Sequence, residues 1–177
     1  MRVKIVNRET NTEITATIKE VSARTMPGIH EGWEFNFNRH AAKQNCHGYI
    51  LVTDDMPTVP EGAMILELKN NEQPIITFLE VAPHNRTPEK KYDNVAGCLI
   101  AYAFKQTFIL AESDFQGLLS IYISEENPTN KDRLVKNYAT KYNAQLNTSE
   151  YLDANEAMMV IIDEDGEALI EKYLTYK

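Results

Sequence analysis

Across most of the chain, short apolar runs alternate with polar turns in the manner of β-strands. Residues 48–55, GYILVTDD, form an apolar run that ends in acids. Residues 63–81, AMILELKNNEQPIITFLEV, form two such runs around a polar turn, which is typical of a hairpin. Pro74 is acceptable at the start of the second run, and Pro83 ends it because proline has no N–H to donate. The pattern predicts three successive antiparallel strands, the third over residues 75–81.

Beyond the polar stretch that follows, the apolar spacing becomes helical. Val95, Leu99 and Phe108 keep a helical period over about five turns, and Asp93 stands where an N-cap is expected. Residues 117–124, GLLSIYIS, then return to a strand-like run. A strand, a long helix and a strand in this order predict a βαβ unit whose two strands are parallel.

Apolar periodicity is clear in the C-terminal part of the chain and weak in the N-terminal part. The C-terminal part predicts a helix over 131–142, a strand over 157–163 and an amphipathic helix over 164–177. The N-terminal part, residues 1–47, has weaker patterns. Ile14 to Val21 alternates loosely as a strand does, and the aromatic residues Trp33, Phe35 and Phe37 are spaced two apart before a polar run. A strand with a short helix fits this segment.

Taken together, these elements predict an α+β domain built on a mixed β-sheet. The chain has 177 residues and is 43% apolar, which is enough to bury a substantial core in one domain. We expect a single domain over residues 1–177, with residues 48–177 as its core.

Composition excludes several classes of function. The net charge is −8, and no basic stripe is concentrated enough to favour a phosphate backbone, so we expect no nucleic-acid partner. No apolar run approaches the ~20 residues of a membrane span, and the N-terminus lacks the apolar segment of a signal peptide. We therefore expect a soluble, cytoplasmic protein that has no membrane partner.

Metal and disulfide chemistry are not indicated either. Cys46 and Cys98 are too few for a disulfide framework, which fits a reducing compartment. His30, His40, Cys46 and His47 lie close together in sequence, but their spacing matches no zinc pattern, so we predict no metal site. The motifs of serine hydrolases, P-loop enzymes and zincins are not present.

The turn into the long helix is a candidate anion site. A strand that ends at a proline and leads into a helix presents unpaired N–H groups at the positive end of the helix dipole. Ala96 and Gly97 are small enough to let a ligand approach the backbone, and Lys90 and Lys91 precede them. The turn therefore suggests a site for a pyrophosphate. The alternative is that the small residues only permit close packing of the helix.

Two segments carry a resemblance to a known family. FLEVAPHN and KYDNVAGCLIAYAFK, followed by a strand and LVKNYATKYNA, resemble the core of the GNAT superfamily of N-acyltransferases, particularly small bacterial GNAT-like proteins. In those proteins the fourth strand ends in Glu-x-Ala-Pro-x-Asn and the main helix begins with Val-Ala-Gly. The resemblance covers Glu61 to Lys177, and it implies a central mixed β-sheet flanked by helices.

The cofactor loop of this family departs from its pattern here. The family carries Arg or Gln, two residues, Gly, one residue, then Gly or Ala, which places Lys91, Asn94 and Ala96 at the three positions. Lys91 keeps a positive charge without the guanidinium fork, and Ala96 conforms. Asn94 replaces a glycine. Asparagine tolerates a left-handed backbone, but its side chain can obstruct a pyrophosphate.

The resemblance implies acetyl-CoA as co-substrate and an amine of a small molecule or peptide as acceptor. The pantetheine would lie between the strand that ends at Val81 and the strand over residues 117–124, and pair with strand backbone. The pyrophosphate would meet the N–H groups of Asn94, Val95, Ala96 and Gly97.

Acyl transfer needs a base for the ammonium and an acid for the departing thiolate. Glu80, at the end of the central strand, is a candidate base; the alternative is a charged strand end that contacts Lys or Arg. Tyr138 falls where many GNAT enzymes carry a tyrosine that donates to the CoA sulfur, although Asn143 and Ala144 replace the Gly-Phe that usually follows; the alternative is an ordinary core aromatic. His84 is a candidate proton relay, or a solvated loop histidine.

Two hypotheses follow from these observations. The first is an N-acetyltransferase that uses acetyl-CoA. The second is a GNAT-like fold without catalysis that binds a ligand or a protein, favoured by Asn94 and by the missing Gly-Phe. An α+β domain outside this family is a third architecture. The acceptor and the oligomeric state are not encoded in any pattern found in the sequence.

Overall fold

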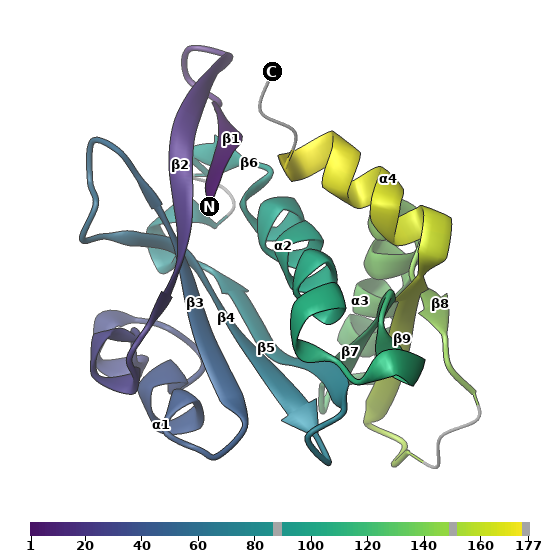
Figure 1. The fold of residues 1–177 in the computed structure, drawn as a ribbon. Coiled ribbons are helices and arrows are strands. Elements are labelled where there is room, and N and C mark those ends of the chain that lie inside the picture. The colour runs from purple at the N-terminus through teal and green to yellow at the C-terminus, as the bar shows by residue number, and fades with distance from the viewer. Residues whose placement is uncertain (87–89, 149–151, 175–177) are drawn as a thin grey trace.

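The computed structural model describes residues 1–86, 90–148 and 152–174. In these residues, nine strands form one mixed sheet in the order β6-β1-β2-β3-β4-β5-β7-β9-β8 (Figure 1). The strands are β1 (Arg2–Asn7), β2 (Thr12–Val21), β3 (Cys46–Thr53), β4 (Pro60–Lys69), β5 (Gln73–Val81), β6 (Tyr92–Asp93), β7 (Leu118–Ser124), β8 (Gln145–Leu146) and β9 (Glu156–Ile162). The α+β class and the mixed sheet are confirmed.

Strand pairing agrees with the sequence prediction in the middle of the sheet. β3, β4 and β5 are antiparallel neighbours, as the three apolar runs predicted. β5 and β7 are parallel, which confirms the βαβ unit. β9 then runs antiparallel to β7. In the strand order, the parallel pair of β5 and β7 has five strands on one side and two on the other.

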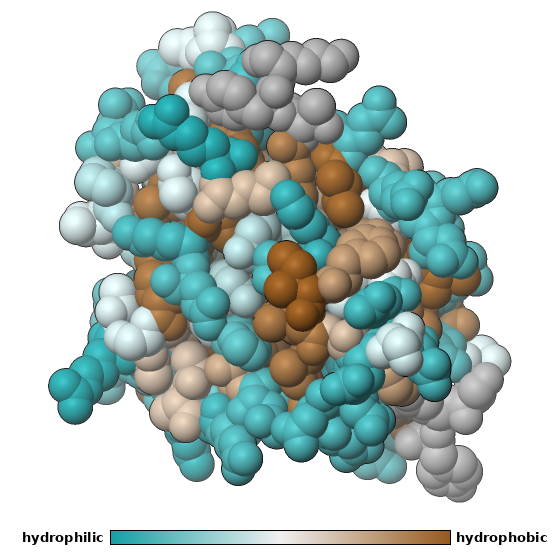
Figure 2. Space-filling view, in the orientation of Figure 1, coloured by the Kyte–Doolittle hydropathy of each residue, from teal (hydrophilic) through white to brown (hydrophobic). Residues whose placement is uncertain are grey.

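Within the described part of the chain, four α-helices accompany the sheet: α1 (Phe37–Ala41), α2 (Val95–Leu110), α3 (Pro128–Tyr142) and α4 (Asp163–Leu174). Figure 1 shows α2 and α4 side by side against the sheet, whereas α1 lies apart from them beside β3. Figure 2 shows apolar side chains exposed over α2, where Phe108 is 47% and Ile109 is 66% exposed. No helix of the described residues is long and apolar enough to cross a membrane.

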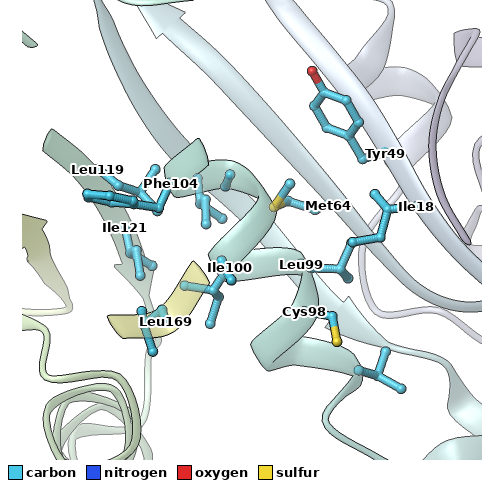
Figure 3. Close-up of a cluster of buried hydrophobic side chains, with 14 of the residues drawn as sticks. Ile18, Tyr49, Met64, Cys98, Leu99, Ile100, Phe104, Leu119, Ile121 and Leu169 are labelled. Atoms are coloured by element: carbon cyan, nitrogen blue, oxygen red, sulfur yellow. The ribbon is translucent and has the colours of Figure 1, made fainter. Parts of the chain in front are cut away.

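The main core lies between the sheet and α2, α3 and α4. Leu99, Ile100 and Phe104 of α2 meet Met64 of β4 and Ile121 of β7 (Figure 3). Each large apolar side chain that is fully buried stabilises the fold by about 1.5–3 kcal/mol. Residues 97–101 of α2 are buried without a break, so this helix is buried on most of its circumference.

α4 approaches α2 closely because of a glycine. A Cβ atom at Gly166 would lie 2.0 Å from Cζ of Phe104, so only glycine leaves room for this ring. Phe104 thereby packs directly against the backbone of α4.

A smaller cluster lies on the opposite face of the sheet. Alternate residues of β4 divide between the faces, since Met64 joins the main core and Ile65 joins this cluster. Trp33 and Phe37 pack against it edge to face, with ring centroids 5.6 Å apart. The period-two aromatic spacing thus belongs to a turn and a short helix that cover the sheet, and Phe35 packs against the same cluster.

The N-cap prediction for α2 was wrong. Asp93 belongs to β6, where it pairs with Val6 of β1, and its carboxylate contacts Arg8 and Lys90. The N-cap is Asn94, one residue later. The prediction failed because β6 forms only by pairing with β1, a strand near the start of the chain, and this long-range pairing leaves no local pattern.

The boundaries of the last helices also shift. α3 begins at Pro128 rather than near Lys131, because Asn127 caps it: its Oδ1 accepts from the N–H groups of Thr129 and Asn130 at 3.0 and 3.4 Å. α4 follows β9 directly. Residues 175–177, which the prediction assigned to this helix, lie outside the described residues.

Candidate functional site

A cleft opens where β5 and β7 separate. The two strands pair only at Ile75 with Ser120 and at Ile76 with Ile121, and they diverge beyond these positions. The cleft is lined by residues 76–80 of β5, residues 121–125 in and after β7, Glu34, Phe35, Leu134 and Tyr138. From Thr77 onward, β5 has no strand pairing on its β7 side. A linear ligand can therefore bond to this strand edge as an added strand does.

A β-bulge marks the inner end of the cleft. Ile65 of β4 pairs with Phe78 and Leu66 pairs with Ile76, so Thr77 is one residue in excess. The bulge resets the alternation of side chains, since Ile76 and Leu79 contact the main core whereas Phe78 contacts the opposite cluster.

Glu80 lies in the cleft wall, with its side chain only 6% exposed. Its Oε1 accepts from the N–H of Glu34 at 2.9 Å, and its Oε2 accepts from the N–H of Phe35 at 3.2 Å. Arg86 forms an ion pair with the same carboxylate. The alternative interpretation of Glu80 was a charged strand end that contacts Lys or Arg. The structure contains such a contact, with Arg86.

Arg86 links this buried carboxylate to a more exposed one. Its Nη1 lies 2.9 Å from Oε1 of Glu34, whose side chain is 67% exposed. Glu34 also lines the cleft. Two carboxylates thus share one guanidinium at the cleft mouth, and this region carries a net negative charge.

Tyr138 of α3 lines the opposite wall of the cleft. Its ring packs near Tyr142, with centroids 5.9 Å apart, and the side chain contacts the main core. Burial raises the pKa of its phenol to about 12. With this pKa the phenol keeps its proton at neutral pH, and its hydroxyl has no hydrogen-bond partner among the described residues.

His84 lies outside this cleft. Its Nε2 is 2.8 Å from Oε2 of Glu61, a carboxylate whose side chain is only 2% exposed. Neither residue is among those that line the cleft. The pair holds the turn after β5 against the start of β4, and no pattern around Glu61 predicts that it is buried.

A second cavity, of about 520 Å³, lies at the N-terminus of α2. This volume is within the usual range of small-molecule sites. Val81, Asn94, Val95, Ala96 and Gly97 line it, which brings together five of the six predicted cofactor-binding residues. Further lining residues are Val6, Lys90, Tyr92, Asp93, Lys141, Tyr142 and Tyr173.

Asn94 adopts the left-handed conformation, with φ of 71° and ψ of 0°, and its side chain makes no capping bond. Gly97 contacts α4, since a Cβ there would lie 2.5 Å from the ring of Tyr173. Close packing against α4 is therefore one reason for the small residue at position 97. Ala96 lines this cavity and also a smaller hollow beside Leu134 and Tyr138.

The two lysines before α2 are placed differently. Lys90 lines the cavity and forms an ion pair with Asp93. Lys91, the sixth predicted residue, is not among the lining residues; its ammonium lies 5.0 Å from the centroid of the Tyr92 ring. Lys141 of α3, which sequence reasoning missed, supplies a second cation to the lining.

Asn85 fixes the loop that carries these lysines. Its Oδ1 accepts from the N–H groups of Lys91 and Tyr92 at 2.8 and 2.6 Å, and its Nδ2 donates to the carbonyl of Tyr92 at 3.2 Å. The side chain is buried. The Asn of the Glu-x-Ala-Pro-x-Asn motif thus closes the loop, a role that spacing alone does not disclose.

A third hollow lies between the cleft and the α2 cavity. It shares Leu79, Leu134 and Tyr138 with the cleft, and Ala96 and Lys141 with the cavity. The three hollows therefore follow one another from the N-terminus of α2 to the bulge in β5. Among the described residues, no group of three or more His, Cys, Asp or Glu side chains could hold a metal ion.

No protein-family model and no curated protein sequence matches the chain. Solved structures do match. Spermidine N-acetyltransferase from Vibrio cholerae in complex with CoA and spermine is 11% identical, with a TM-score of 0.53 over 86% of this chain and 98% of that one. A GNAT family acetyltransferase from Elizabethkingia anophelis with acetyl-CoA bound is 14% identical, with a TM-score of 0.50 over 84% and 98%. A chain of the KacTA–DNA complex is 14% identical, with a TM-score of 0.53 over 89% and 99%.

These similarities define the class of fold. The protein has a GNAT-like fold, as the sequence resemblance predicted. At these identities the likeness extends to the fold and not to a substrate.

Proposed function

We propose that the protein is an N-acetyltransferase that uses acetyl-CoA. The observation that carries this proposal is the succession of three hollows from the N-terminus of α2 to the divergence of β5 and β7. The GNAT-like fold supports it, because two similar structures were solved with CoA or acetyl-CoA. The fold alone fixes no function, so the argument rests on the site.

The pyrophosphate would bind at the N-terminus of α2. The N–H groups of residues 94–97 and the helix dipole favour an anion there, and Lys90 and Lys141 add positive charge. The pantetheine would run past Val81 along the unpaired edge of β5. Lys91 remains a predicted contributor, with a smaller effect than Lys90 because its side chain lies over Tyr92.

Bound acetyl-CoA supplies an activated acyl group as a thioester. The acceptor amine first loses its ammonium proton and then attacks the carbonyl carbon. A C–N bond forms, the C–S bond breaks, and the nitrogen releases a second proton to solvent. Tyr138 then gives its proton to the departing thiolate, since it is protonated at neutral pH and lines the cleft. It regains a proton from solvent.

Glu80 acts mainly by position. Three donors already bond to its carboxylate, so little of it is left to take a proton from the acceptor, directly or through a water molecule. It holds residues 34–35 at the cleft mouth and adds fixed negative charge. His84 with Glu61 would act farther away, as support for the turn after β5.

The acceptor would be a cationic amine. Glu34, Glu80 and Glu125 line the cleft, and Arg86 offsets one of these charges. A protonated amine is attracted to such a site, whereas an acidic acceptor is repelled. One similar structure contains spermine, which is a cationic amine.

A binding module without catalysis is the second candidate. Asn94 in place of glycine narrows the approach to the first turn of α2, and Tyr173 stands directly against Gly97. In that case the fold would hold a ligand or a partner without transferring an acyl group.

Calorimetric titration with acetyl-CoA and with CoA tests both candidates. Binding that weakens strongly in Lys90→Ala and little in Lys91→Ala supports the site described, and the two variants are matched controls for each other. Binding by Asn94→Gly but not by the native chain favours the second candidate. If neither the native chain nor Asn94→Gly binds acetyl-CoA or CoA, and both are folded, the proposed cofactor is contradicted. Turnover with a panel of diamines and dicarboxylates then tests the charge of the acceptor.

A further inference from the structure

A continuous group of aromatic rings lies on the face of the sheet opposite the main core. Trp33 meets Phe37 edge to face, and Phe37 meets Phe35 with ring centroids 6.0 Å apart. The ring of Phe35 lies 5.1 Å from that of Phe78 in β5, and His40 of α1 stacks on Phe78 at 3.8 Å. Trp33 and Phe37 are buried, whereas Phe35 and Phe78 are only half-buried. One end of the group is therefore core, and the other end is accessible.

The accessible end of this group lines the cleft. Phe35 and Phe78 are both among its lining residues, and we call this pair the aromatic wall. The rings of Phe37 and His40 pack against them, so the wall is held in place before any ligand binds. The cleft encloses about 190 Å³, and a cavity of about 150 Å³ already accepts a benzene molecule. The space beside the wall is therefore sufficient for one aromatic ring.

The carboxylates of the cleft are not arranged for a polycation. Glu80 is buried and already accepts from three donors. Glu34 is exposed, but it shares Arg86 with Glu80. Oε1 of Glu125 accepts from the N–H of Asn127 at 3.0 Å. Each carboxylate thus has a donor already, and their net charge attracts one ammonium group to the cleft rather than holding several along it.

The aromatic wall lies next to the proposed path of the cofactor. Phe78 and Leu79 are successive residues of β5, and their side chains point to opposite faces of the sheet. Leu79 lines the hollow that joins the cleft to the α2 cavity. The wall and the cofactor path therefore meet across a single strand edge, and a short linker spans the distance between them.

We infer that the acceptor is an arylalkylamine, whose aromatic ring packs on Phe35 and Phe78 while a short alkyl linker carries its amine to the thioester. This inference rests on the proposed function and names the class of acceptor. Aromatic pairs contribute about 0.5–1.5 kcal/mol beyond the burial of their area, so the wall favours a flat ring over a saturated one. The carboxylates at the cleft mouth attract the ammonium group of such a molecule.

Three amines separate recognition of a ring from recognition of charge. Phenethylamine has the ring and one ammonium group, cyclohexylethylamine has the same linker with a saturated ring, and putrescine has two ammonium groups and no ring. With saturating acetyl-CoA, we expect kcat/KM for phenethylamine to exceed that for cyclohexylethylamine by about two- to tenfold. Putrescine should be the poorest acceptor of the three. Release of the CoA thiol measures all three rates.

Variants of the aromatic wall test whether these residues cause the preference. Phe35→Leu and Phe78→Leu keep an apolar side chain and remove the ring, so phenethylamine should lose its advantage over cyclohexylethylamine. Phe35→Tyr keeps the ring and should keep the advantage. Phe108→Leu is the matched control, because Phe108 is 47% exposed on α2 and does not line the cleft. Thermal unfolding of each variant shows that it is folded.

Binding of the ring can also be measured without any transfer of an acyl group. In an NMR titration of phenethylamine with the native protein and CoA, the ring protons should shift upfield, as protons stacked on aromatic rings do. The dissociation constant from this titration should rise by about two- to tenfold in Phe35→Leu and stay unchanged in Phe108→Leu.

The outcomes distinguish the inference from the function beneath it. If the native chain binds neither acetyl-CoA nor CoA, the proposed function fails, and the inference fails with it. If it acetylates putrescine better than phenethylamine, the inference is overturned while the proposed function stands. The same conclusion follows if phenethylamine does not bind, or if its binding and turnover are unchanged in both Phe35→Leu and Phe78→Leu.

Discussion

The carboxylate of Glu80 accepts a hydrogen bond from the backbone N–H of Glu34 at 2.9 Å, across 46 positions of the chain. This bond ties the turn before α1 to the end of the central strand. Together with the bond from Phe35 and the ion pair with Arg86, it makes one carboxylate the junction of three segments. The cleft mouth is therefore assembled by a buried charge.

Glu80→Gln should destabilise the protein. The glutamine amide keeps the size of the carboxylate but removes its charge. Its NH₂ group is itself a donor, and it would face the N–H groups of Glu34 or Phe35 and the guanidinium of Arg86. We expect a loss of about 1–3 kcal/mol in the free energy of unfolding, measured by urea denaturation. Glu72→Gln, in the exposed hairpin turn, is the control and should change stability little. Equal stability of the two variants would show that the contacts of Glu80 contribute nothing to folding.

Tyr138→Phe should lower turnover with little change in acetyl-CoA binding. General acids contribute about 10²-fold or more to rate, so kcat should fall by about that factor. Tyr122→Phe is a matched control, because Tyr122 also lines the cleft but its hydroxyl bonds to Glu156. If both variants keep full turnover, Tyr138 is an ordinary core aromatic.

The raised pKa of Tyr138 also predicts an effect at alkaline pH. The unfolded state loses its phenol proton near pH 10, before the folded state does near 12, so this group's contribution to stability falls as pH rises through that interval. Above pH 10 the native chain should lose stability faster than Tyr138→Phe. Parallel curves of unfolding free energy against pH would contradict the shift.

His40 should make the protein less stable in mild acid. Its ring stacks on Phe78, with centroids 3.8 Å apart, and burial lowers its pKa, with further contributions from Lys43 and Arg39. The unfolded state therefore takes up a proton first, near pH 6.5, and the free energy of unfolding falls as pH decreases below that value. Between pH 7.5 and 5.5, the native chain should lose more stability than His40→Phe. The other three histidines are common to both proteins, so an equal loss would exclude His40 as the cause.

Gly166→Ala should be destabilising although alanine favours helices. The new methyl group would meet the ring of Phe104 at 2.0 Å, inside the packed core. Overpacking of this kind costs about 1–3 kcal/mol, which outweighs the gain of about 1 kcal/mol in helix propensity. At Gly28 the nearest atom is the flexible amide of Asn38 at 3.2 Å, so Gly28→Ala is the milder comparison. Thermal unfolding of both variants decides whether the contact of α4 with α2 is as close as described.

The central elements could be predicted because their signals are local. β3, β4, β5 and β7 are apolar runs bounded by turn residues, and Val95, Leu99 and Phe108 of α2 stand at helical spacing. β6 has two residues, and its partner β1 lies far away in sequence. No local pattern distinguishes such a pair, and the error at Asp93 follows from it.

The candidate site was only partly visible in the sequence. The resemblance pointed to the α2 cavity, because residues 94–97 are consecutive and line it together, although Lys91 does not. It did not locate Lys141, which reaches the cavity from α3, nor the bulge at Thr77, which depends on the register between β4 and β5. It also gave no sign that the backbone N–H groups of Glu34 and Phe35 bond to Glu80. Properties that depend on pairing between distant segments are those that spacing does not reveal.

The position of Trp33 has a practical consequence. It is the only tryptophan of the chain, it is buried beside Phe37, and the next residue donates its N–H to Glu80. Intrinsic fluorescence excited at the indole therefore reports on one wall of the cleft mouth and hardly at all on α2 or α4. A change in emission during a titration would indicate that the ligand alters the cleft mouth near Glu34. A titration that releases heat without a change in emission would indicate binding in the cavity at the N-terminus of α2.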